Sequence, residues 1–191
     1  QDVAESFGAG VAERRAQGRT AEIAIDEQHA LADLAKALEE LRTALSLDDK
    51  VRLAHFYTGL IHLKAGKFPN AAREFELELS VNPSDFQAKF HLAFVVLAQQ
   101  ETERGIKMMR DIVREQPEFA DARYELGKAL LQKGDVKGSV ESLEIAARLK
   151  PNQPHVHYQL GRAYIAAGRK AEGESQLEIS KDLKEKARTK I

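Results

Sequence analysis

Residues 120–153 read ADARYELGKALLQKGDVKGSVESLEIAARLKPNQ, and this stretch decides the fold. Two runs with helical spacing of apolar residues flank a turn at residues 133–135, and Pro151 ends the second run. The same pattern fits again when the window moves by 34 residues in either direction. Prolines recur with this period, at Pro83, Pro117 and Pro151. The sequence therefore predicts an array of helical hairpins.

Four such units are predicted from residue 52 onward. Their bounds are 52–85, 86–119, 120–153 and 154–187. Small residues recur in the second run of each unit, at Ala71, Gly105, Ser139 and Gly173. Large apolar residues follow four positions later, at Phe75, Met109, Leu143 and Leu177. Such pairs let two helices approach closely and interlock, so we expect tight packing within each hairpin.

The predicted turns and helix ends follow from local chemistry. Glycine at positions 66, 134 and 168 accepts the left-handed conformation that ends a helix. The second unit has residues 99–102 at this place, and its turn must be made without glycine. We expect Ser84 to cap the helix after Pro83, and Pro154 to occupy the first turn of another helix.

Residues 1–51 are predicted to form an N-terminal helical capping segment with a partial repeat. A long helix is expected from Thr20 to Leu47. One face of it carries Leu31, Leu34, Leu38, Leu41 and Leu45, which also fits a short coiled-coil seam. We favour a buried helix of the array, because Ala37 and Leu41 lie one period before Ala71 and Phe75. At the other end, the last helix is expected to run on through residues 181–186, and residues 188–191 form a C-terminal tail.

The composition is that of a soluble folded chain, with 43% hydrophobic and 31% charged residues among 191. A formal net charge of −1 creates no positive electrostatic field that would attract nucleic acid. The absence of cysteine excludes disulfides and thiolate chemistry. No apolar stretch approaches the roughly 18 to 20 residues that span a bilayer. Because the chain begins with Gln1, we expect a processed product or an excised piece. Both a cytoplasmic protein and one exported after signal removal fit these features.

The unit resembles the tetratricopeptide repeat, a 34-residue pattern with Leu-Gly-x2-Tyr, then Ala-x3-Phe, then proline. Residues 160–164, LGRAY, match the first part, and residues 71–75, AAREF, match the second. The resemblance covers residues 52–187. The usual tryptophan is replaced, at His55, Lys89, Arg123 and His157. Glu78 stands where a small residue is expected, and Glu185 stands where a fourth proline would be.

The resemblance implies an all-α, right-handed α-solenoid of antiparallel helix pairs, whose first helices line a concave groove for peptides or proteins. Groove residues in this family lie at the fifth, ninth and twelfth positions of a unit, which share one helix face. The resulting candidates for partner binding are Phe56, Leu60, Phe90, Phe94, Tyr124, Lys128, Tyr158 and Arg162. The twelfth positions add Leu63, Leu97, Leu131 and Ile165. Packing between units is the alternative explanation for the aromatic fifth position.

The predicted ligand is a protein or peptide with an apolar or amphipathic segment, with an acidic end near Lys128 and Arg162. One branch of the family clamps a terminal carboxylate with lysine, asparagine and arginine. Phe56, Leu60, His91, Asp121 and Glu125 occupy the corresponding places here, so the resemblance implies that this clamp is absent.

We therefore predict a non-catalytic protein-binding adaptor without cofactor, metal site, nucleic-acid partner or membrane span. The alternative is a structural or self-assembly module whose groove is filled by another copy or by its own N-terminal segment, with Phe7, Val11, Ile23 and Ile25 as apolar anchors. No catalytic constellation is recognisable. His155 and His157 are expected to be exposed or interfacial, and the glutamate-rich residues 74–78 to form a solvated face.

Overall fold

The computed structural model describes residues 36, 37, 39–41, 43, 47 and 53–189, and within them all regular structure is helical. The helices are α2 (Ala54–Lys64), α3 (Phe68–Val81), α4 (Phe86–Ala98), α5 (Thr102–Glu115), α6 (Ala120–Lys133), α7 (Val136–Leu149), α8 (Pro154–Ala166) and α9 (Lys170–Arg188). The predicted capping helix is described only at residues 36, 37, 39–41, 43 and 47, which are helical. Its remaining leucines and the N-terminal apolar anchors lie outside the described residues.

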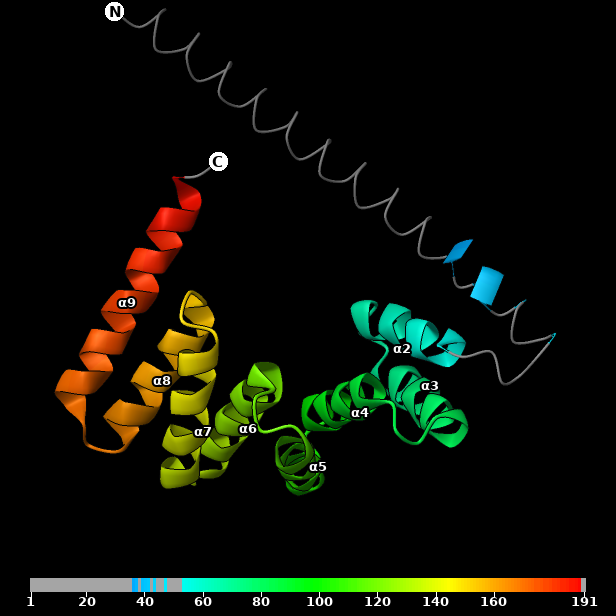
Figure 1. Ribbon diagram of the computed structural model, residues 1–191, viewed down its shortest axis with the longest axis horizontal. Helices are drawn as coiled ribbons and strands as arrows, with labels where there is room; N and C mark the ends of the chain where they lie inside the picture. The colour runs from blue at the N-terminus through cyan, green and yellow to red at the C-terminus, as the bar shows by residue number, and fades with distance from the viewer. Residues whose placement is uncertain (1–35, 38, 42, 44–46, 48–52, 190–191) are drawn as a thin grey trace, which may run out of the picture.

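The helices form a row of antiparallel pairs that leads from α2 to α9 (Figure 1). Each helix from α3 to α8 packs against the helix before it and the helix after it. The first helices of successive pairs, α4, α6 and α8, also touch one another. Because each pair contacts only its neighbours, the chain has the predicted all-α solenoid of helix pairs.

The predicted interlocking within each pair is present. A Cβ atom added at Gly127 would lie 2.6 Å from Cγ of Leu143, and one at Gly59 would lie 2.7 Å from Cε1 of Phe75. Phe75, Met109 and Leu143 are fully buried. Glycine in the first helix therefore leaves the space that the large side chain of the second helix fills.

The turns follow the prediction, including the one without glycine. Gly66, Gly134 and Gly168 have φ values of 69°, 90° and 78°. In the second pair Gln100 takes this role with a φ of 66°. The backbone of Gln100 thus adopts a left-handed conformation that is uncommon for residues other than glycine.

One predicted helix cap is wrong. Asp85, not Ser84, caps α4, because its Oδ1 accepts a hydrogen bond of 3.0 Å from the backbone N–H of Ala88. The Ser84 hydroxyl instead donates to Oδ1 of Asn82 at 3.0 Å. Aspartate and serine are equally suitable caps, and the position of the helix start decides between them. Pro154 does begin α8, as predicted.

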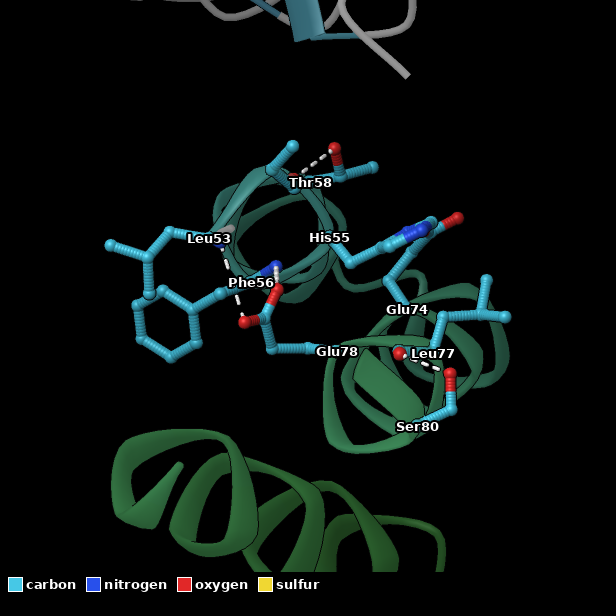
Figure 2. A network of polar contacts seen from close by, with 9 residues as sticks. Leu53, His55, Phe56, Thr58, Glu74, Leu77, Glu78 and Ser80 are labelled. Atoms are coloured by element: carbon cyan, nitrogen blue, oxygen red, sulfur yellow. Dashed lines mark hydrogen bonds and ion pairs between the residues drawn. The ribbon is translucent and has the colours of Figure 1, made fainter. Parts of the chain in front are cut away.

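The prediction of a solvated face for residues 74–78 is also wrong in part. Glu76 is exposed, but Glu78 is fully buried. Figure 2 shows why: the Glu78 carboxylate accepts hydrogen bonds of 3.3 Å from the backbone N–H groups of Leu53 and Phe56. The first turn of a helix has N–H groups without partners, and it attracts negative charge. Glu78 of α3 therefore caps the start of α2.

The last helix runs through Arg188, as the prediction of a continuing polar helix requires. It anchors to α8 where Oγ of the buried Ser180 donates to the carbonyl of Pro154 at 2.7 Å. Among the described residues, no helix combines the length and the apolar character that crossing a membrane demands.

Candidate partner-binding groove

The predicted aromatic column lies on the first helices of the pairs, with Phe56 on α2, Phe90 on α4, Tyr124 on α6 and Tyr158 on α8. The first three side chains are half-buried, whereas Tyr158 is 44% exposed. The environment of the column thus changes along the array, and its four members have different neighbours.

Phe56 packs between the first two helix pairs. Its ring centroid lies 5.9 Å from that of the buried Phe75 and 5.6 Å from that of His91. His91 in turn stacks on Phe75 at 5.5 Å. At this end of the array the aromatic position therefore contributes to packing between units, the alternative explanation for the column.

A pocket of about 290 Å³ lies at the middle of the array, and we name it the central pocket. Its lining comes from α2, α4, α6 and α8. The lining residues are Leu63, Phe90, His91, Phe94, Asp121, Tyr124, Glu125 and His155. Three of the predicted binding residues, Phe90, Phe94 and Tyr124, thus come together in one concave site.

A second pocket of about 180 Å³ adjoins the central pocket along α4 and α6. It is lined by Phe94, Leu97, Ala98, Glu125, Lys128, Ala129 and Gln132. Phe94 and Glu125 line both pockets. The two together form a continuous surface, called the groove from here on, which contains four of the eight predicted residues.

The two cationic residues among the predicted binding residues, Lys128 and Arg162, differ in their surroundings. Nζ of Lys128 lies 2.6 Å from Oε2 of Glu125 and 5.5 Å from the centroid of the Tyr124 ring. Arg162 is exposed, and it donates a hydrogen bond of 3.3 Å to Oε1 of Gln159. Within residues 53–189 no carboxylate pairs with Arg162, so its charge is available to a ligand.

The acidic lining of the central pocket did not figure among the predicted binding residues. Asp121 and Glu125 lie one turn apart on α6, a spacing that places them on one face. Nζ of Lys150 lies 2.7 Å from Oδ1 of Asp121 and 2.8 Å from its Oδ2. Glu125 is buried, with 8% of its surface exposed. From the sequence, Asp121 and Glu125 were considered only because they stand where one branch of the family has the residues of its carboxylate clamp.

Two histidines complete the central pocket. Burial lowers the pKa of His91, and the negative charge of Asp85 opposes this shift. His155, at the start of α8, stacks edge-on against Tyr124 with ring centroids 4.9 Å apart. Burial of Tyr124 raises the pKa of its hydroxyl, an effect that the charge of Lys128 opposes. The walls of the pocket therefore carry aromatic faces and carboxylates, with His91 in its neutral form at neutral pH.

The remaining predicted residues lie outside the groove. Tyr158 is next to α9, where Nζ of Lys184 lies 5.6 Å from the centroid of its ring. Leu60 lines a separate pocket of about 490 Å³ together with Ala37, Glu40, Leu41, Tyr57, Ile61 and Lys64. The chain that precedes α2 thus contributes to the surface around Leu60.

The described residues contain no group of three or more histidine, aspartate or glutamate side chains able to hold a metal ion. His155 is exposed, as expected, but His157 is buried. Nδ1 of His157 lies 2.7 Å from Oε1 of Gln176, and Nε2 lies 2.7 Å from the carbonyl oxygen of Pro151. His157 therefore fills the position of the family's tryptophan with hydrogen bonds to neighbouring elements.

Known proteins were compared with this chain in sequence and in structure. The sequence profile of the tetratricopeptide repeat matches residues 24–85 and 92–154. No curated protein sequence matches. A crystal structure of MamA superposes with a TM-score of 0.74 at 18% identity, over 86% of this chain and 96% of that chain. The MamA fragment from Desulfovibrio magneticus RS-1 gives a TM-score of 0.68 at 21% identity, over 82% and 86%.

A further neighbour is YrrB, described as a tetratricopeptide repeat protein with an unusual peptide-binding site. It superposes with a TM-score of 0.66 at 18% identity, over 81% of this chain and 79% of that chain. Identities at this level show a shared fold. The profile matches in two long segments that together cover more than half of the residues. The chain belongs to the tetratricopeptide repeat family.

Proposed function

We propose that this protein is a non-catalytic adaptor that holds a segment of another protein in the groove. The observation that carries the proposal is the central pocket, where Phe90, Phe94 and Tyr124 form three aromatic walls of one cavity. Ligand sites are concave and mostly apolar, with a few placed polar groups, and this pocket has that composition. The membership of the tetratricopeptide repeat family supports a role in protein interaction.

The proposed ligand is an apolar or amphipathic segment. Aromatic side chains are the usual anchors of protein interfaces, and truncating one commonly costs about 2 kcal/mol or more of binding free energy. An acidic residue of the ligand would lie near Arg162, whose charge has no carboxylate partner in the described chain. Lys128 is less suited to this task, because Glu125 already pairs with it. The peptide site of YrrB, a protein of the same fold, supports such a use of the array.

A second candidate is the structural or self-assembly module. Its support is the pocket around Leu60, where Ala37 and Leu41 of the same chain face Tyr57 and Leu60 of α2. In that arrangement the N-terminal part of this chain, or of another copy, covers the surface around Leu60, one of the predicted binding residues.

Affinity capture from a lysate of the source organism tests the first candidate. The intact chain is compared with a Phe90→Ala/Tyr124→Ala variant. Phe86→Ala is the matched control, because Phe86 also lies on α4 and packs on Phe119 at 4.9 Å, as Phe90 does, but does not line the groove. Circular dichroism confirms that all three chains are folded. A protein retained by the intact chain and by Phe86→Ala but lost by the double variant supports the adaptor.

Deleting residues 1–19 separates the two candidates. An adaptor with an open groove keeps its solubility and thermal stability after the deletion. A groove filled by the N-terminal segment loses stability, because apolar surface becomes exposed to water. Equal capture by all variants, together with such a loss, would favour the assembly module.

A further inference from the structure

We propose that the central pocket selects a cationic side chain, lysine or arginine, that lies between apolar residues of the bound segment. This inference rests on the proposed function, because it assigns the chemistry of the ligand at that site. It adds a positively charged anchor to a ligand for which the sequence predicted only apolar residues and an acidic end.

Aromatic rings form the first part of the proposed recognition site for the cationic side chain. Phe90, Phe94 and Tyr124 come from two adjacent helices and line the same cavity. The face of an aromatic ring attracts a cation within about 6 Å of its centroid. The structure already contains this interaction at the rim, where Nζ of Lys128 lies 5.5 Å from the centroid of Tyr124. The rings would also contact the alkyl part of a long basic side chain.

Carboxylates form the second half. Asp121 and Glu125 line the cavity. Glu125 is buried, and its ion pair with Lys128 uses Oε2. No hydrogen bond from the described residues reaches Oε1 of Glu125. This oxygen is therefore open to solvent at the cavity wall, and it can accept a charge-assisted hydrogen bond from an ammonium or guanidinium group.

The cations that already pair with these carboxylates lie outside the lining of the central pocket. Lys128 and Lys150 have side chains that are 32% and 39% exposed. Because both ammonium groups are partly exposed to water, a ligand cation can share or replace them. Burial lowers the pKa of His91, so its ring adds no positive charge to the cavity at neutral pH.

An anionic ligand group is the poorer occupant of this cavity, because the carboxylates of Asp121 and Glu125 would repel it. Its place is near Arg162 on α8. A segment with a basic residue in the central pocket and an acidic residue toward α8 would therefore bind in one direction. Charge placement would fix the orientation as well as the composition of the ligand.

The test selects peptides from a random display library on the intact chain and measures affinity by fluorescence anisotropy. Each enriched peptide is compared with its version in which the basic residue is replaced by methionine. Both peptides are measured on the intact chain, on Asp121→Asn/Glu125→Gln and on the control Glu118→Gln, whose side chain is exposed and outside the groove. The methionine replacement should weaken binding to the intact chain and to Glu118→Gln about ten-fold or more, and to the double variant by much less.

The outcomes separate this inference from the proposed function. Enriched peptides that need Phe90 and Tyr124 but share no basic residue would overturn the inference and leave the adaptor standing. Peptides that bind independently of Phe90 and Tyr124 would overturn both. If the library yields no peptide, NMR titration with N-acetyl-arginine methylamide decides. Selective shifts of the Tyr124 and His155 resonances, absent with N-acetyl-norleucine methylamide, support the cation site, and equal shifts with both compounds overturn it.

Discussion

Nζ of Lys128 lies 2.6 Å from Oε2 of Glu125, three residues earlier on α6. The sequence assigned Lys128 to an acidic group of the ligand, but the ion pair supplies such a group from within the chain. The same pair leaves the other oxygen of Glu125 at the wall of the central pocket. Lys128 therefore competes with a cationic ligand for the pocket.

Replacing Lys128 with methionine should raise the affinity for a peptide with a basic anchor about two- to five-fold, because the competing ammonium group is removed. The free energy of unfolding should fall by about 1 to 3 kcal/mol, because the buried Glu125 loses its partner. Anisotropy titration and urea denaturation give both values. Lys137→Met, at an exposed position of α7, is the control. A loss of affinity in Lys128→Met would show that Lys128 itself contacts the ligand.

Replacing Glu78 with alanine should lower the free energy of unfolding by roughly 2 kcal/mol, because two N–H groups at the start of α2 lose their acceptor. Glu78→Gln should cost less, since its amide oxygen still accepts. Urea denaturation measures both changes. Glu76→Ala, at an exposed position of the same helix, should be close to neutral. Equal stability of Glu78→Ala and Glu76→Ala would argue against the cap.

Replacing Gly127 with alanine should destabilise the chain by about 1 to 3 kcal/mol, because its Cβ would lie 2.6 Å from Cγ of Leu143 and 3.2 Å from the carbonyl oxygen of Ser139. Alanine favours a helix more than glycine does, so a loss of stability reports the steric clash alone. Gln132→Ala, exposed on the same helix, controls for helix propensity. A Gly127→Ala chain as stable as the intact one would mean that α6 and α7 separate without cost.

The His91→Phe variant should change how stability depends on pH. Because burial lowers the pKa of His91 in the folded chain, the unfolded chain binds a proton more readily. The contribution of His91 to stability is therefore lost as pH falls below its ordinary value of 6.5. Phenylalanine keeps an aromatic ring against Phe56 and Phe75 but cannot be protonated. The stability of His91→Phe relative to the intact chain should thus increase between about pH 7 and pH 5. A constant difference would contradict the assigned shift.

The fold could be predicted from the sequence because its determinants are local and repeated. The period of 34 residues places glycines 127 and 59 opposite Leu143 and Phe75, and each hairpin obeys the same spacing. Turn chemistry is local as well, and a turn without glycine was expected at residues 99–102, although the sequence did not single out Gln100 for the left-handed conformation. Repetition also located the aromatic column on the first helices.

The details of the site depend on contacts that the repeat does not encode. The burial of Glu78 requires the unpartnered N–H groups of α2, which lie 22 and 25 residues earlier in the chain. Phe56 packs against Phe75 and His91, which belong to two different helix pairs, and the repeat pattern does not reveal this contact. The acidic wall could have been noticed from the spacing of Asp121 and Glu125 on α6, but its position beside three aromatic rings needs the assembled array.

Site-specific photo-crosslinking tests the central claim most directly, because it records which surface touches the partner. A photoreactive phenylalanine analogue is placed at position 124 in the groove, and in a second chain at the exposed position 137 on α7. Irradiation in a lysate of the source organism is followed by mass spectrometry. The adaptor predicts a crosslink from position 124 to a segment of another protein, and none from position 137. Crosslinks from position 137 alone, or from position 124 only to residues 1–51 of this chain, would contradict it.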